Sequence, residues 1–243
     1  MKQVTTDGGI KLSVSWSPDG NKIAFISQRG GKTRLFIIHL LLNRQWSVSI
    51  GAENYLTPSW SPDGNRLVFS ASKDGNYDIY ISNPDGSNVV RLTDHWSIDL
   101  SPSFSPDGRY IAFVSDRSGS PQVYIMNSDG SGIRRLTFQG SYNAQPSWSP
   151  RGDKIAFISL SDGNNFDIFT INPDGTGLQR LTSASGSNES PSWSPDGRFI
   201  AFSSTRSGIS QIYLMNANGL NQKRLTETKT AATHPSWSPR FEK

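Results

Sequence analysis

Short apolar stretches recur along the chain, and each is separated from the next by polar turn residues. In one such stretch, Asp78–Ser82, polar and apolar residues alternate, which is the period of a half-buried β-strand. Pro58–Ser61, Arg66–Ser70 and Val89–Thr93 flank it and are also predicted to be extended. Pro62-Asp63-Gly64 between two of them is a tight-turn sequence. The pattern predicts four short antiparallel strands, named A to D from the inside outward, and no helix.

This four-strand unit repeats with a fixed period. An aromatic anchor ends each strand A, and successive anchors are 44 residues apart, except for one gap of 45. The anchors are Trp16, Trp60, Phe104, Trp148, Trp193 and Trp237. About 44 residues for four strands is the size of one propeller blade. We therefore predict an all-β chain forming one β-propeller over residues 1–243. Its repeats are expected at 13–56, 57–100, 101–144, 145–189 and 190–233, with a partial blade from 1–12 and 234–243.

The two ends of the chain do not complete a further repeat. Residues 2–5 read as an orphan strand D, and His234–Pro239 as an orphan strand A. Three arrangements remain open: a six-bladed propeller cut short, a five-bladed closure, or open strand edges that pair with a second copy. The last predicts self-association. A fragment or an engineered propeller would have the same pattern.

The composition argues against several classes of function. The 243 residues carry a formal net charge of +4, contain no cysteine, and hold no apolar run near the length of a membrane helix. We expect no disulfide, no membrane span and no nucleic-acid partner. The N-terminus has Lys2 but no apolar segment behind it, so no signal peptide is expected.

Longer motifs within the repeats resemble a known family. Residues 101–137 contain Ser-Pro-Ser-Phe-Ser-Pro-Asp-Gly-Arg, then Ser-Asp-Arg-Ser-Gly, then a closing Arg-Arg-Leu-Thr. This string resembles the WD-like repeat of TolB-type β-propellers, and the resemblance covers nearly the whole chain. It implies six-bladed geometry and non-enzymatic protein–protein interaction at the bacterial cell envelope, in the Tol–Pal system. It also implies a periplasmic or cell-envelope location. The chain resembles only the propeller part of TolB.

Strand direction assigns the predicted loops to two faces. The A–B and C–D turns share one face, and the longer, more variable B–C and D–A loops share the other, where binding is expected. The position three residues before each anchor should line the channel mouth on that face. The candidate partner-binding residues there are His95, Trp96, Asp99, Tyr142, Asn143, Gln145, Glu189 and His234. The alternative for the aromatic rings is that each covers the end of its own blade.

A basic position recurs thirteen residues after the anchors. It is occupied by Arg29, Lys73, Arg117 and Arg206, while Ser161 interrupts the series. A ring of like charges could attract an acidic partner. The stronger interpretation is local pairing, with Asp116 beside Arg117.

Catalytic motifs are poorly represented. The three histidines have no metal-ligand spacing, and no HExxH motif occurs. Gly130-Ser-Gly132 precedes a strand rather than a helix, which argues against a nucleotide fingerprint. We predict a non-enzymatic scaffold without metal or cofactor, whose partner is a protein. The alternative is a carbohydrate-binding or polysaccharide-lyase-like propeller.

Overall fold

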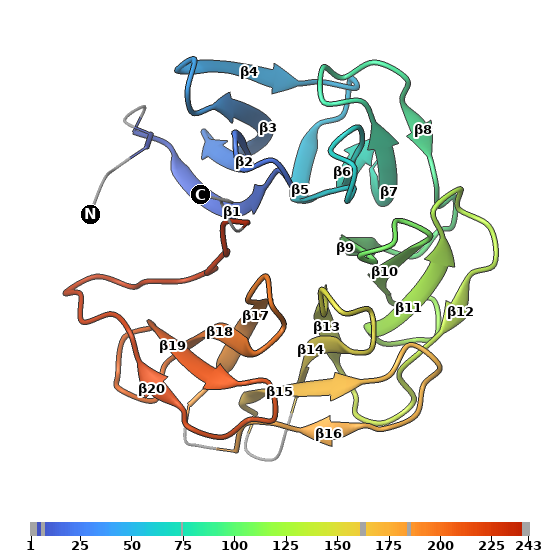
Figure 1. The fold of residues 1–243 in the computed structure, drawn as a ribbon. Helices are drawn as coiled ribbons and strands as arrows, with labels where there is room; N and C mark the ends of the chain where they lie inside the picture. The colour runs from blue at the N-terminus through green and yellow to red at the C-terminus, as the bar shows by residue number, and fades with distance from the viewer. Residues whose placement is uncertain (1–3, 6–7, 74, 161–163, 184–185, 240–243) are drawn as a thin grey trace.

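The computed structural model is a β-propeller made of five four-stranded antiparallel sheets (Figure 1). It describes residues 4–5, 8–73, 75–160, 164–183 and 186–239. In each sheet the four strands are paired in chain order. The strands are β1 (Ile10–Trp16), β2 (Lys22–Arg29), β3 (Lys32–His39), β4 (Arg44–Val48), β5 (Asn54–Trp60), β6 (Leu67–Lys73), β7 (Asn76–Ser82), β8 (Val90–Arg91), β9 (Asp99–Phe104), β10 (Tyr110–Ser115), β11 (Gln122–Asn127), β12 (Arg134–Arg135), β13 (Asn143–Trp148), β14 (Ile155–Leu160), β15 (Phe166–Ile171), β16 (Gln179–Arg180), β17 (Asn188–Trp193), β18 (Phe199–Ser204), β19 (Gln211–Asn216) and β20 (Lys223–Arg224).

The core lies between neighbouring blades. The face of one sheet that carries Val68, Ile79 and Leu92 packs against Phe104, Phe113 and other apolar residues of the next sheet. The same arrangement joins the other successive sheets. Because the second, third and fourth sheets each have a neighbouring blade on both faces, their B and C strands are apolar on both sides, unlike the half-buried outer strands. The small alanine in the middle of strand B, such as Ala112, is fully buried at this close packing.

The ring is open between the fifth and first blades. Successive blades contact one another, but no described strand of the fifth sheet lies within 8 Å, between Cα atoms, of a strand of the first. The C-terminal segment crosses this opening from β20 toward β1 (Figure 1). Leu225 is 52% exposed there, whereas its equivalents Leu92, Leu136 and Leu181 are buried. The arrangement is five blades in a ring with a sixth position that the described strands do not fill.

Neither orphan strand forms among the described residues. His234–Pro239 is not a strand, because no described strand lies beside it to pair with. It nevertheless occupies the place of a sixth inner strand. The Trp237 indole N–H donates to the Ser192 carbonyl at 3.1 Å, as Trp193 donates to Ser147 at 3.1 Å. Of the predicted N-terminal strand at residues 2–5, the first two residues lie outside the described part of the chain, and Val4 and Thr5 belong to no strand.

The recurrent Ser-Pro-Asp-Gly sequence forms the A–B turn. In the third blade the Ser105 hydroxyl donates to Asp107 Oδ1 at 2.6 Å and accepts the Tyr110 N–H at 2.9 Å. Gly108 has a φ of 71°, which glycine adopts without strain. Hydrogen bonds from Ser105, and the nearby Arg109, lower the pKa of Asp107 from 3.8 to about 2. The repeated motif therefore builds a structural turn.

These turns should make the fold sensitive to acid. Since the folded-state pKa of Asp107 is depressed, its stabilisation is complete above the unfolded value near 4 and is lost as the pH falls toward 2. The hydroxyls of Ser61 and Ser194 likewise lower the pKa of Asp63 and Asp196. We expect the urea midpoint to fall between pH 4 and pH 2. Ser105→Ala should flatten this dependence, and an unchanged slope in that variant would contradict the assignment.

Candidate functional site

One mouth of the central channel is lined by a ring of polar side chains. A cavity of about 300 Å³ is bounded by the residues three positions before each anchor. They are Ser13, Thr57, Ser101, Gln145, Ser190 and His234. The sequence pattern predicted this set, and the cavity confirms that all six meet at one end of the channel. Figure 1 shows the inner strands β1, β5, β9, β13 and β17 around this centre.

Backbone geometry explains how these residues reach the mouth. A register shift interrupts each inner strand at this point, as between Ala144 and Ser147. The residue at the shift has a positive φ in four of the five strands and again at His234, with values from 40° to 56°. Non-glycine residues adopt this conformation only at some cost, so the surrounding fold must hold it. At Ser190 the support is a hydrogen bond from its N–H to Gln145 Oε1, 2.7 Å.

Two ionisable groups belong to this region, and burial favours the neutral form of both. Burial raises the pKa of Glu189, which lies one residue before Ser190. Partial desolvation also lowers the pKa of His234, although this residue still reaches solvent. Desolvation penalises the charged form of each group, which explains the direction of both shifts. The mouth is thus a polar surface suited to hydrogen bonding.

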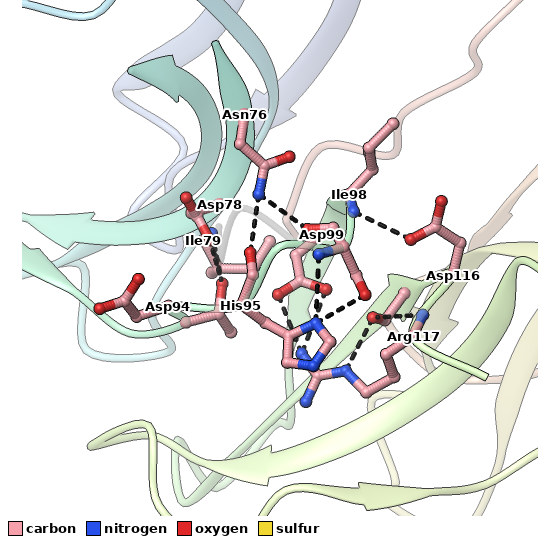
Figure 2. Close-up of polar contacts among 12 residues, drawn as sticks. Asn76, Asp78, Ile79, Asp94, His95, Ile98, Asp99, Asp116 and Arg117 are labelled. Carbon is pink, nitrogen blue, oxygen red and sulfur yellow. Dashed lines mark hydrogen bonds and ion pairs between the residues drawn. The ribbon is translucent and has the colours of Figure 1, made fainter. Parts of the chain in front are cut away.

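The connection between β8 and β9 presents an aromatic pair to solvent. The Trp96 side chain is 79% exposed, and its ring centroid lies 5.0 Å from that of His95. Figure 2 shows the polar contacts of the loop around His95. Asn76 Nδ2 donates to the carbonyl oxygens of His95 and Ser97 at 2.7 and 2.9 Å. A large exposed ring on a loop held in this way is typical of an interface anchor.

Asp99 supports this loop from beneath. Its carboxylate is fully buried and forms an ion pair with Arg117 Nη2 at 3.0 Å. Asp116, the neighbour of Arg117 in sequence, instead accepts the Ile98 N–H at 2.9 Å (Figure 2). The predicted pairing of Arg117 with Asp116 is therefore wrong, because strand pairing brings β9 closer to Arg117 than its own loop does. Asp99 has no surface for a partner in this arrangement.

The other candidate residues divide between surface and interior. Tyr142 is 37% exposed but packs on Phe166, with 5.3 Å between ring centroids. Asn143 is buried and donates to Gln122 Oε1 and the Gln139 carbonyl, both at 2.8 Å. Tyr142 therefore covers the end of its blade in part, and Asn143 braces the D–A connection.

The predicted basic ring is not a uniform charged surface. The Arg117 guanidinium lies 5.2 Å from the ring centroid of Tyr124, and that of Arg206 lies 4.7 Å from Tyr213. Arg29 and Lys73 are exposed. Two of the four basic groups thus cover aromatic side chains of their own blades.

No group of three or more His, Cys, Asp or Glu side chains that could hold a metal ion occurs among the described residues. Within the same part of the chain, no helix is long and apolar enough to cross a membrane. Sequence reasoning missed a cavity of about 800 Å³ between the third and fourth blades, lined by Leu136, Phe157 and Phe169 among others. Its one sequence signal was Ser161, which breaks the basic series and lies outside the described residues.

Known proteins share both the fold and the repeat. TolB from Acinetobacter baumannii is 29% identical, with a TM-score of 0.86 over 98% of this chain and 59% of its own. A TolB candidate from Agrobacterium tumefaciens is 25% identical, with a TM-score of 0.85 over 97% of this chain and 88% of its own. A Protein TolB homolog from Chlorobium luteolum is 51% identical over 39 residues, which are 16% of this chain and 9% of that protein. The chain thus spans less than two thirds of the Acinetobacter baumannii and Chlorobium luteolum proteins.

A family model for the TolB beta propeller domain matches residues 1–241. The match includes all five described sheets and the C-terminal segment in the sixth position. The chain belongs to the TolB beta propeller domain family.

Proposed function

We propose that the chain is a non-enzymatic scaffold that binds a protein partner through the face formed by its B–C and D–A loops. The TolB-like propeller fold supports a role in protein interaction in general. The observation that carries the choice of face is the exposed His95–Trp96 pair on its braced loop. Loops on a rigid scaffold commonly carry binding residues, and tryptophan is enriched among energetically dominant contacts. By family resemblance, the partner belongs to the bacterial cell envelope.

The energetic argument rests on preorganisation. Ordering a flexible loop on binding costs free energy, and a loop already held by hydrogen bonds avoids most of that cost. Asn76, Asp116 and the buried Ser97 together restrain the segment that carries Trp96. Burying the exposed Trp96 indole against a partner would also release more free energy than its present contact with His95 provides. The loop is therefore suited to act as a fixed anchor.

The test places a photo-crosslinking amino acid at single positions in the cell. At Trp96 we expect a discrete adduct with a second protein. Leu42 is 69% exposed on the C–D turn of the first blade, on the opposite face, and serves as the matched control. Equal adducts from positions 96 and 42, or none from 96, would reject the proposed face.

Self-association is the second candidate, favoured by the open ring. Leu225 is 52% exposed at the unfilled sixth position, and uncovered apolar sheet faces favour association. The same crosslinker at position 225 would yield an adduct of twice the chain mass if copies pair there. An adduct of that mass from position 96 would instead identify the partner on the loop face as a second copy.

A further inference from the structure

Each blade contains an aromatic pair at the same place in strands B and C. The paired residues are Phe25 with Phe36, Phe69 with Tyr80, Phe113 with Tyr124, Phe157 with Phe169, and Phe202 with Tyr213. Their ring centroids are 5.7 to 6.4 Å apart. The five pairs are therefore equivalent surfaces, and differences in what covers them can be compared directly.

A further side chain covers the pair in four of the blades. Arg117 lies 5.6 Å from Phe113, and Arg206 lies 5.3 Å from Phe202. In the first blade Lys11 Nζ is 5.8 Å from Phe25. In the second, the ring of Tyr55 is 5.9 Å from that of Phe69. Three of the four covers are cations, which an aromatic face attracts through its quadrupole.

The fourth blade lacks such a cover among the described residues. The 800 Å³ cavity lies at this pair and is lined by both Phe157 and Phe169. Phe169 is partly exposed, whereas Tyr124 and Tyr213 in the same position are buried. In sequence, the arginine position of this blade is Ser161. The fourth blade thus has the aromatic surface without the in-chain guanidinium that covers it in the third and fifth.

The polar groups that hold a guanidinium are nevertheless present. In the fifth blade Arg206 donates to Asn188 Oδ1 at 2.6 Å and to Ser204 Oγ at 2.9 Å. The equivalent residues in the fourth blade are Asn143 and Ser159, and both line the cavity. Ser159 is 6% exposed. Asn143 uses its Nδ2 group as a donor, which leaves Oδ1 able to accept.

The positive charge of Arg180 at the cavity does not prevent a cation from binding. Arg180 Nη2 forms an ion pair with the buried Asp167 at 2.5 Å. Moreover, Arg135 and Arg224 hold the same place in the third and fifth blades, which accommodate Arg117 and Arg206. The surroundings that tolerate two arginines in those blades recur in the fourth.

We propose that this cavity binds the guanidinium group of an arginine side chain from a partner protein. The planar cation stacks on Phe169, as Arg206 does on Tyr213, and donates hydrogen bonds to Asn143 and Ser159. Arginine suits the site better than lysine because its fork of N–H groups can contact both acceptors while its face lies on the ring. The site lies between the third and fourth blades, apart from the Trp96 loop, but residues of the D–A and B–C loops line it, so this inference rests on the proposed function. Arginine binding in solution is measured independently of crosslinking at Trp96, so the two proposals can fail separately.

The test titrates the whole chain with N-acetyl-arginine amide and follows backbone amide signals by NMR. The citrulline analogue, which has the same shape without the charge, is the control ligand. We expect arginine to bind about tenfold more tightly than citrulline, with shifts at Ser159 and Phe169. Equal binding of the two ligands, or no arginine binding at tens of millimolar, would overturn the proposal. Tighter binding of agmatine than of the capped arginine would point to a free small molecule instead.

Variants test the same inference from within the chain. Ser161→Arg restores the residue found in the third and fifth blades, and should both raise the thermal midpoint and abolish arginine binding. Phe169→Tyr copies those blades and should keep binding, whereas Phe169→Leu should weaken it. If Ser161→Arg does not fold, the two Phe169 variants still decide. Retained binding in both Ser161→Arg and Phe169→Leu would place the ligand elsewhere.

Discussion

Phe113→Ala should lower the free energy of unfolding by about 3–5 kcal/mol, the usual range for truncating a buried phenylalanine. The ring is fully buried between the second and third blades, within the cluster that includes Val68, Ile79 and Leu92. It also lies 5.8 Å from the Tyr124 ring and beneath the Arg117 guanidinium. Truncation therefore leaves a cavity and removes a cation–π contact together. Urea unfolding followed by circular dichroism measures the change.

Phe138→Ala is the matched control, since it makes the same chemical change at a side chain that is 72% exposed. Its ring contacts the Arg135 guanidinium, 4.9 Å away, and its removal should cost about 0.5 kcal/mol. A loss below about 1 kcal/mol for Phe113→Ala would mean that neighbouring blades close over the cavity. The contrast tests whether contacts between blades determine the stability of the ring.

The blades were predictable because their signals are local. In the second repeat, alternating apolar residues and the Pro-Asp-Gly turn placed strands B and C within a few residues of the observed β6 and β7. The outer strands were overestimated: Val89–Thr93 was predicted, whereas β8 contains only Val90 and Arg91. An outer strand pairs on one side only, so its residues form fewer ladder hydrogen bonds than their composition suggests.

The site was less predictable because its geometry depends on residues distant in sequence. Asp99 and Arg117 are 18 residues apart, and their pairing follows from the register between β9 and β10. The D–A loop pattern identified Asn143 as a surface candidate, but Gln122 holds it in the interior. The channel mouth was an exception, because a repeated position on equivalent strands must face the same axis. The cavity at Phe169 could not be predicted from its own blade. Ser161 stands where the third and fifth blades have Arg117 and Arg206, and only this comparison draws attention to the uncovered aromatic pair.

Asp167→Ala should destabilise the fold by about 2–4 kcal/mol, because it removes the acceptor shared by three donors. Asp167 Oδ1 accepts from Thr182 Oγ1 at 2.7 Å and from Asn188 Nδ2 at 3.0 Å. Its other oxygen pairs with Arg180, whose side chain is 40% exposed, so water can compensate part of that loss. The carboxylate thus joins strand C to the end of strand D and to the start of the next inner strand.

The control is Asp94→Ala, which removes a carboxylate that is 83% exposed and contacts Arg91 at 2.9 Å. It should change stability by about 0.5 kcal/mol or less. Thermal and urea unfolding of both variants measure the difference, and hydrogen exchange at residues 186–190 should rise only in Asp167→Ala. Gln122 and Gln211 fill the same role in the third and fifth blades through their Oε1 atoms. A neutral acceptor therefore suffices at this position. Equal losses of unfolding free energy in Asp167→Ala and Asp94→Ala would contradict a structural role for the shared acceptor.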